Sequence, residues 1–221
     1  GGEHGCALRG GAAVCWGTPA DGRIRAPAGR FTTITAGSAH TCALTPAGEA
    51  TCWGSNTFGQ TRAPRGPFTQ LSAGGDHTCA LQVGGPAECW GASRGGQTTL
   101  PDENYVQIAA GGQHTCGLTS DGRVLCSGYN DYFQLNPPAG AYRKIAAGGL
   151  HNCALPAGDV LISSNLTEGL PAVCWGDGGA GQTRPPQQAF ETIAAGNLHT
   201  CGLGRDVVVC WGMNDDGQAS P

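Results

Sequence analysis

The sequence predicts an all-β protein, a β-propeller of six four-stranded blades, with seven blades, one of them incomplete, as the alternative. All twelve cysteines and all six histidines fall in one motif that occurs six times. Between the motifs, short β-type runs are separated by Gly, Pro and Asn, and no helical period of ten or more residues occurs. About four short strands in a unit of this length are typical of a propeller blade.

The motif is a His-x-Cys followed by a second Cys. Successive motif histidines are 36, 37, 37, 37 and 48 residues apart, so the repeat occupies the whole chain. We therefore predict a single domain, 1–221, without a linker. Its repeat units are approximately 1–30, 31–67, 68–104, 105–141, 142–189 and 190–221.

The chain opens in the middle of a unit. Its first four residues, Gly1–His4, are in register with Gly111–His114, so the strand that begins the other units has no counterpart here. This register predicts a fragment of a longer chain, in which a missing strand or blade lies upstream or is supplied from elsewhere.

Each complete unit begins with a strand of the type Phe31–Ala36. Ile34 and Ala36 lie two residues apart and therefore on one face of that strand. The same aliphatic-x-Ala pattern recurs in the units that begin at Phe68, Tyr105, Tyr142 and Phe190. A small residue at this position suits a strand close to a crowded propeller axis.

A β-hairpin follows, and its loop length changes together with the separation of the two cysteines. Cys42 and Cys52 are symmetric about a three-residue loop, Pro46–Gly48, with Gly at the left-handed position that such loops favour. Cys6 and Cys15 are one residue closer and are symmetric about a two-residue Gly-Gly loop. The two cysteines of each unit are therefore expected to lie opposite each other, about 4.5–5.5 Å apart at Cα.

This register predicts six disulfides, each within one blade. The alternative is a metal site, since His-x-Cys with a second Cys offers three ligands, but six sites that each lack a fourth ligand are less economical. We therefore predict no metal and no cofactor. The predicted pairs are Cys6–Cys15, Cys42–Cys52, Cys79–Cys89, Cys116–Cys126, Cys153–Cys174 and Cys201–Cys210.

Composition narrows the class of protein. Only 13% of the 221 residues are charged, the net charge is −4, and the eleven Arg and single Lys are spread along the chain, so no basic stripe indicates nucleic acid. No run of eighteen apolar residues could span a membrane. Six disulfides indicate an oxidising compartment, extracellular or at the cell surface. Asn165 lies in an N-glycosylation sequon within the longest hairpin insertion, which makes it a candidate glycosylation site.

The recurring pattern Ala-Gly-Gly-x-His-Thr-Cys-x-Leu, followed by Cys-Trp-Gly-x-Asn and Gly-Gln, resembles the regulator of chromosome condensation repeat. The resemblance covers essentially the whole chain. The form with paired cysteines is most similar to CRINKLY-type plant receptor kinase ectodomains, and it also resembles the secreted propeller that inhibits β-lactamases. This resemblance implies a β-propeller, usually of seven blades, that works by binding proteins. It does not carry over the nucleotide-exchange activity of the nuclear founding member, because paired cysteines and the lack of a basic patch argue against a chromatin-bound protein.

The fourth unit departs most from the repeat. Ser127 stands where the other units have Trp, and Phe133 stands where the equivalent loops have Gly. Exposed Tyr-rich clusters are common interaction sites; the alternative is that the tyrosines of this loop refill the volume that the missing Trp leaves. The candidate partner-binding residues are Tyr129, Asn130, Asp131, Tyr132 and Phe133 in this loop, with Phe58 and Arg94 in the equivalent loops of units two and three.

No catalytic motif stands out, and every His belongs to the repeat, where a structural hydrogen-bonding role is expected. The sequence therefore predicts a non-enzymatic, extracellular protein-binding or assembly module, such as a receptor ectodomain, a surface or matrix component, or a secreted inhibitor. Its partner would be a protein or neighbouring subunits. A lectin-like carbohydrate-binding propeller is the alternative, and a carboxylate-based glycan-active enzyme is a third possibility.

Overall fold

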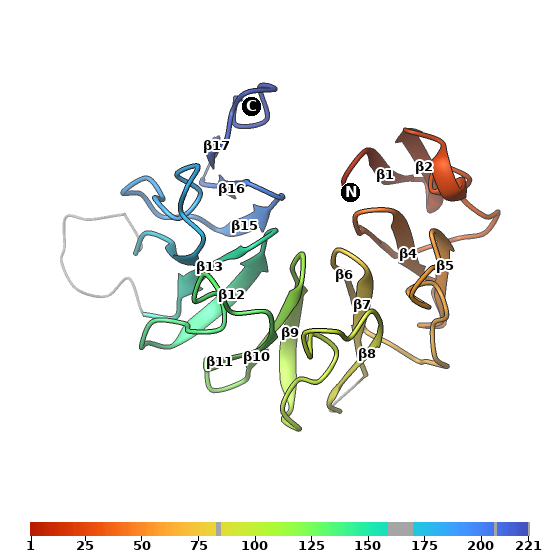
Figure 1. Ribbon diagram of the computed structural model, residues 1–221, viewed down its shortest axis with the longest axis horizontal. Coiled ribbons are helices and arrows are strands. Elements are labelled where there is room, and N and C mark those ends of the chain that lie inside the picture. Colours follow the sequence, from red (N-terminus) through yellow and green to blue (C-terminus); the bar gives the residue numbers. More distant parts are fainter. Residues whose placement is uncertain (83–84, 159–169, 206, 221) are drawn as a thin grey trace.

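A computed structural model describes residues 1–82, 85–158, 170–205 and 207–220. It contains six antiparallel sheets, which follow one another in chain order in an arc around a common centre (Figure 1). The sheets are β1 (His4–Arg9) with β2 (Ala12–Gly17); β3 (Thr33–Ala36), β4 (His40–Leu44) and β5 (Ala50–Gly54); β6 (Gln70–Ala73), β7 (His77–Leu81) and β8 (Ala87–Gly91); β9 (Tyr105–Ala110), β10 (His114–Thr119) and β11 (Val124–Gly128); β12 (Tyr142–Ala147), β13 (His151–Pro156) and β14 (Val173–Gly176); and β15 (Thr192–Ala195), β16 (His199–Leu203) and β17 (Val208–Gly212).

The six-blade, all-β prediction is confirmed, but the expected four strands per blade are wrong. Five sheets have three strands and the first has two. After the third strand the chain forms a turn instead of a fourth strand, as in the loop that ends at Gln60. The side-chain amide oxygen of Gln60 accepts a hydrogen bond from the backbone of Phe58, and Pro64 follows shortly after. Pro has no N–H to give to a ladder, so the chain here continues to the next blade without pairing.

All six predicted disulfides are present, one in each sheet. The two cysteines of each pair are direct cross-strand neighbours, as in Cys42 opposite Cys52, with Cα atoms 4.1 Å apart. In the first sheet Gly10 and Gly11, with φ of 59° and 87°, form the predicted two-residue turn. A primed turn of this kind requires positive φ at both positions, which only Gly adopts without cost.

The strand nearest the centre in each three-stranded sheet carries the recurring Ala, as expected. Ala36, Ala73, Ala110, Ala147 and Ala195 all face the central cavity. The turns that follow them are joined from blade to blade by backbone hydrogen bonds around the centre, for example from the N–H of Gly75 to Gly112 at 3.2 Å and from Gly112 to Gly149 at 3.0 Å. Larger side chains would separate these backbones, because a Cβ on Gly75 would lie 2.3 Å from a neighbouring carbonyl oxygen.

Apolar clusters lie between successive blades rather than within one. The cluster around Phe68 combines Cys42 and Leu44 of one blade with Leu71 and Ala80 of the next. The aromatic residue that begins each blade also packs near the Trp after its second Cys, with ring centroids 5.4–6.3 Å apart in the four pairs Phe31–Trp53, Phe68–Trp90, Tyr142–Trp175 and Phe190–Trp211.

Trp16 is packed differently from the other four Trp residues. The other four Trp side chains are buried or half-buried, whereas Trp16 is 57% exposed. The indole N–H of each of those four donates to a backbone carbonyl that precedes its own blade, as Trp90 does to Gln60. Among the described residues no sheet covers the corresponding face of the first sheet, so Trp16 lies against Gly5 and remains in contact with solvent.

Candidate functional site

Each blade is joined to the next by a buried histidine. The Nε2 atoms of His40 and His77 lie 2.8 Å from the hydroxyls of Thr78 and Thr115, and His114 Nε2 lies 2.9 Å from Asn152 Oδ1. His4 and His151 make the same contact with the following blade. The expected structural role of the repeat histidines is therefore confirmed for five of the six.

The hydrogen-bond partners also fix the tautomer of these histidines. The hydroxyls of Thr78 and Thr115 donate their only proton to the backbone carbonyls of Gln60 and Gln97. Asn152 Oδ1 is an amide oxygen and can only accept, while the amide nitrogen of the same side chain donates to Gln134 O. In His40, His77 and His114, Nε2 must therefore carry the proton, and Nδ1 is left unprotonated in the interior. Burial lowers the pKa of His40, His77 and His151 to about 4.

Five equivalent loops follow the outermost strands and lie at the end of the sheets where these histidines begin. Their first residues donate backbone hydrogen bonds to the turn before the histidine of the same blade, as Tyr129 does to Gln113 and Ser55 to Ala39. A Gln at the end of each loop accepts from the backbone two residues earlier, as in Tyr132 to Gln134 at 2.9 Å. The scaffold thus holds the loops in one conformation while their sequences vary.

Two of these glutamines have a side-chain amide nitrogen without an acceptor. Gln60 and Gln134 are fully buried, and their Nε2 atoms have no hydrogen-bond partner among the described residues. In the fifth blade, Gln182 Nε2 donates to Asp177 Oδ2 at 3.1 Å. Ser55 occupies the position of Asp177 in the loop that ends at Gln60.

We therefore expect Ser55→Asp to stabilise the protein. The new carboxylate would accept from Gln60 Nε2, and satisfying a buried donor is worth about 1 kcal/mol. Urea unfolding with the disulfides intact measures the change, with Ser55→Ala as the control that lacks an acceptor. Equal free energies of unfolding for the two variants would contradict the prediction.

The candidate residues of blades two to four lie in adjacent loops. The guanidinium carbon of Arg94 lies 5.4 Å from the centre of the Phe58 ring, a cation–π contact between two blades. A Cβ on Gly95 would lie 3.5 Å from the backbone nitrogen of Tyr129, so the next pair of loops also meets. We name the surface formed by Phe58, Arg94, Tyr129, Tyr132 and Phe133 the loop stripe.

Phe133 is the most exposed large apolar side chain of the loop stripe, at 70%. Its backbone has φ of 60°, in the left-handed region, where the equivalent loops have Gly59, Gly96, Gly181 and Gly217. This conformation costs a residue with a side chain about 1–2 kcal/mol. Phe133 is strained and largely exposed, so burial of its ring does not explain why a residue with a side chain adopts this backbone conformation.

Tyr132 does not fill the space of the missing Trp, because 47% of it is exposed, whereas Tyr129 is half-buried. The partly buried residues that pack on the cluster around Tyr105 are Ala87, Cys89, Leu100 and Leu125. Ser127, at the Trp position, has a buried hydroxyl without a hydrogen-bond partner among the described residues.

The polar candidates of the fourth loop fix its shape. Asn130 accepts from the backbone of Leu135 at 2.8 Å and donates to Asn136 at 3.1 Å. The Tyr129 hydroxyl donates to Asp131, and this hydrogen bond raises the pKa of Tyr129. Asn130 and Asp131 therefore act within the loop, whereas Tyr132 and Phe133 project from it.

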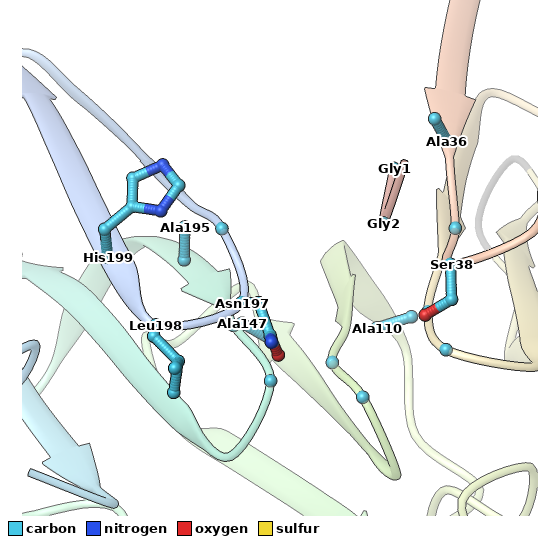
Figure 2. Close-up of a pocket in the computed structure, with 18 of the residues that line it drawn as sticks. Gly1, Gly2, Ala36, Ser38, Ala110, Ala147, Ala195, Asn197, Leu198 and His199 are labelled. Carbon is cyan, nitrogen blue, oxygen red and sulfur yellow. The ribbon is translucent and has the colours of Figure 1, made fainter. Parts of the chain in front are cut away.

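A central cavity of about 490 Å³ opens beside the axial turns (Figure 2). Small residues line most of it, and Asn197, Leu198 and His199 of the sixth blade lie on one wall, opposite Gly1, Gly2 and Ser38. His199 is the one repeat histidine whose Nε2 has no hydrogen-bond partner in the part of the chain that the structure describes. The titratable side chains among its lining residues are His199 and Asp216.

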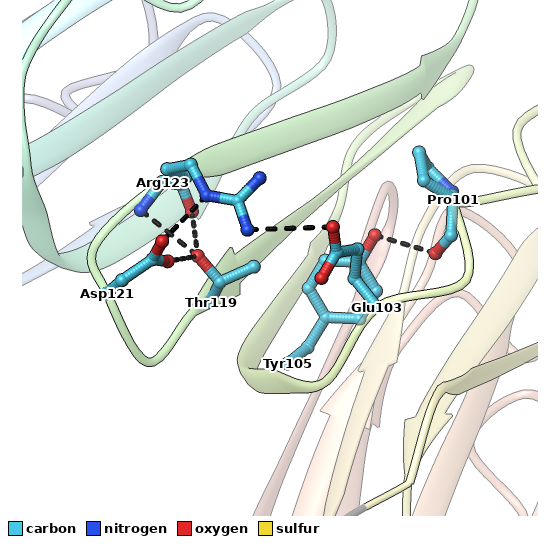
Figure 3. Close-up of polar contacts among 6 residues, drawn as sticks. All are labelled: Pro101, Glu103, Tyr105, Thr119, Asp121 and Arg123. Atoms are coloured by element: carbon cyan, nitrogen blue, oxygen red, sulfur yellow. Dashed lines mark hydrogen bonds and ion pairs between the residues drawn. The ribbon is translucent and has the colours of Figure 1, made fainter.

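At the end of the fourth sheet that is opposite to loop 129–134, charged residues fix the β10–β11 hairpin (Figure 3). Arg123 pairs with Asp121 at 2.7 Å and with Glu103 at 3.5 Å, and the Tyr105 hydroxyl donates to Pro101 O. Hydrogen bonds from Thr119 and Arg123 lower the pKa of Asp121 to about 2. These contacts connect the hairpin to the segment before β9, and they lie apart from the loop stripe.

No group of three His, Cys, Asp or Glu side chains is arranged to hold a metal ion within residues 1–82, 85–158, 170–205 and 207–220. All cysteines are disulfide-bonded, so none supplies a thiolate ligand. No helix in these ranges is long and apolar enough to cross a membrane. Asn165, the candidate glycosylation site, lies outside the described residues.

Two segments, residues 31–60 and 105–134, match the Regulator of chromosome condensation (RCC1) repeat. The structure is similar to the CRINKLY WD40 ectodomain of the Arabidopsis thaliana receptor kinase ACR4, with 30% identity and a TM-score of 0.76 over 96% of this chain and 76% of that one. The chain belongs to the RCC1-like propeller family.

Other RCC1-like propellers align over nearly all of the chain. The ectodomain of the Physcomitrella patens receptor kinase CR4 is 28% identical, with a TM-score of 0.74 over 95% of this chain and 59% of that one. Yeast RCC1 (Prp20), in its complex with Kap60, is 18% identical, with a TM-score of 0.73 over 97% and 69%, and supports the fold alone. A comparison with curated proteins gave no match.

Sequence reasoning located the loops of this RCC1-like propeller but missed two features. The Phe58–Arg94 contact depends on the spacing of neighbouring blades, which no single repeat encodes. The Thr or Asn that accepts the hydrogen bond of each joining histidine directly follows the histidine of the next blade, as in His77-Thr78, and this recurrence was the available signal.

Proposed function

We propose that this RCC1-like propeller is an extracellular, non-enzymatic module that binds a protein partner through the loop stripe. One observation carries the proposal: Phe133 exposes its ring from a backbone conformation that its equivalents reserve for Gly. Three further aromatic side chains and Arg94 lie on the same loop and on the two preceding loops, which the Gln hydrogen bonds hold in place. Aromatic residues and Arg are the types most often found at interaction hot spots.

The compartment is inferred from the six disulfides and from the ectodomain relatives. Disulfides persist in oxidising compartments and are rare in the cytosol. ACR4 and CR4 are receptor kinases whose matched parts are ectodomains. An extracellular binding module, as a receptor ectodomain, a surface or matrix component, or a secreted inhibitor, fits these features.

Phe133→Gly is expected to abolish binding without destabilising the protein. The substitution removes the exposed ring and relieves about 1–2 kcal/mol of left-handed strain, part of which the greater freedom of Gly in the unfolded chain offsets. Truncating a hot-spot side chain weakens binding about thirtyfold or more.

The measurement is selection of a displayed random-peptide library on the wild-type protein, followed by titration of the enriched peptides. Val106→Asn is the matched control, because Val106 is 58% exposed but lies in β9, outside the loops. Equal binding by the Phe133→Gly variant and the wild-type protein, or no enrichment at all, would refute the proposal. Binding to a glycan array that needs the same residues would instead favour the carbohydrate-binding alternative.

A further inference from the structure

We propose that the loop stripe recognises an acidic segment of its partner, in which a carboxylate binds Arg94 beside an apolar or aromatic residue on Tyr132 and Phe133. This inference rests on the proposed function and adds the chemistry of the partner. It comes from the state of Arg94 and from the distribution of charge over the five loops.

Arg94 is exposed and oriented, and its hydrogen-bonding capacity is unused. Phe58 holds one face of its guanidinium, while no ion pair or hydrogen bond engages its N–H groups within the described residues. Three of the other ten arginines have partners for their N–H groups: Arg23 pairs with Asp21, Arg123 pairs with Asp121, and Arg143 donates to backbone carbonyls. A guanidinium held by an aromatic face has donors in a fixed plane, which matches the two oxygens of a carboxylate.

Charge over the loop face is divided between its two sides. Within the loops 55–60, 92–97, 129–134, 177–182 and 213–218, Arg94 is the single cation. The carboxylates of these loops belong to the fourth, fifth and sixth blades: Asp131, Asp177, Asp215 and Asp216. A partner carboxylate is therefore attracted at the third blade and repelled from the fourth blade onward, which sets the direction in which a segment lies along the loop stripe.

The aromatic end supplies the apolar contact. Asp131 already accepts from Tyr129, so the groups that remain for a partner there are the rings of Tyr132 and Phe133. A segment that crosses from Arg94 to Phe133 would therefore combine Asp or Glu with an apolar or aromatic residue at a fixed spacing. A basic segment would meet Arg94 as a like charge.

The test repeats the peptide selection with Arg94→Gln and compares the enriched sequences. The wild-type protein should enrich peptides with Asp or Glu at a fixed distance from an aromatic or large aliphatic residue. Arg94→Gln should lose the acidic preference but keep the apolar one, and it should bind a wild-type-selected peptide about tenfold or more weakly. Binding of that peptide to the wild-type protein should also weaken as salt is added.

Arg9→Gln is the matched control, since it removes the same charge from an exposed site at the end of β1, next to the hairpin turn. It should leave both the selected sequences and the affinities unchanged. Enrichment that requires Phe133 but shows no acidic preference, or is unchanged in Arg94→Gln, would overturn this inference and leave the proposed function intact. Absence of any enrichment that depends on Phe133 would overturn both.

Discussion

Lowering the pH from 6.5 to 4 should destabilise the folded protein steeply. The pKa values of His40, His77 and His151 fall from 6.5 in the unfolded chain to about 4 in the fold, because burial penalises the charged ring. Between these values the unfolded state binds protons that the folded state does not, so stability is lost as the pH falls. Each histidine contributes about 1.4 kcal/mol per pH unit in this window, and three together about 4 kcal/mol per pH unit.

The hydrogen bonds explain why the folded state resists protonation. In His40 and His77, Nε2 already carries a proton and donates to the next blade, so an added proton would have to sit on Nδ1. The Nδ1 atoms of these three histidines are buried and have no partner in the described part of the chain. An imidazolium there would be a buried charge with an unsatisfied donor.

Urea unfolding at a series of pH values, with the disulfides intact, measures this dependence. His77→Gln should lower the slope between pH 4 and 6.5 by about 1.4 kcal/mol per pH unit, whatever its effect on stability at neutral pH, because one titrating group is removed. The low pKa of Asp121, about 2, places the titration of that exposed carboxylate outside this window. A flat free energy of unfolding between pH 6.5 and 4.5 would contradict the assignment.

What the sequence predicted well was set within one repeat. Cys6–Cys15 and Cys42–Cys52 differ by one residue in separation and by one residue in loop length, so cross-strand register followed directly. The axial position of residues such as Ala36 followed from a period of two on a strand. Both are local rules of β-structure that need no knowledge of the neighbouring blade.

What the sequence did not predict depends on contacts between repeats. Four strands per blade were expected, but after Trp53 Gln60 fixes a turn through a side-chain bond that hydrophobic patterning does not report. Trp16 carries the same motif as Trp53 and differs only in what lies next to it. For the loop stripe, the departure of Phe133 from Gly was visible in the sequence, whereas its left-handed backbone and its exposure were not.

Removing a single hydroxyl between two blades should cost about 2–4 kcal/mol. Thr78 accepts from His40 Nε2 at 2.8 Å and donates to Gln60 O at 3.3 Å, and both Thr78 and His40 are fully buried. Thr78→Val keeps the shape of the side chain but leaves the N–H of His40 without an acceptor. An unsatisfied buried donor costs about 1–3 kcal/mol, to which the lost bond to Gln60 adds about 1 kcal/mol. Gln60 O keeps its bond from Trp90, which limits the loss.

The chain contains its own control for this substitution. Asn152 stands at the equivalent position of the fifth blade, where Oδ1 accepts from His114 and Nδ2 donates to Gln134 O at 2.8 Å. Thr78→Asn should therefore restore both hydrogen bonds and recover at least about 1 kcal/mol relative to Thr78→Val.

A double-mutant cycle with His40→Phe then separates the hydrogen bond from other effects of the substitutions. In the His40→Phe background Thr78→Val should cost less by about 1 kcal/mol or more, because no ring N–H is left unpaired. Equal costs in the two backgrounds would show that the histidine does not join the blades. The same bond recurs at five blade interfaces, so this one coupling energy measures how far the propeller depends on contacts between repeats rather than on the disulfide within each.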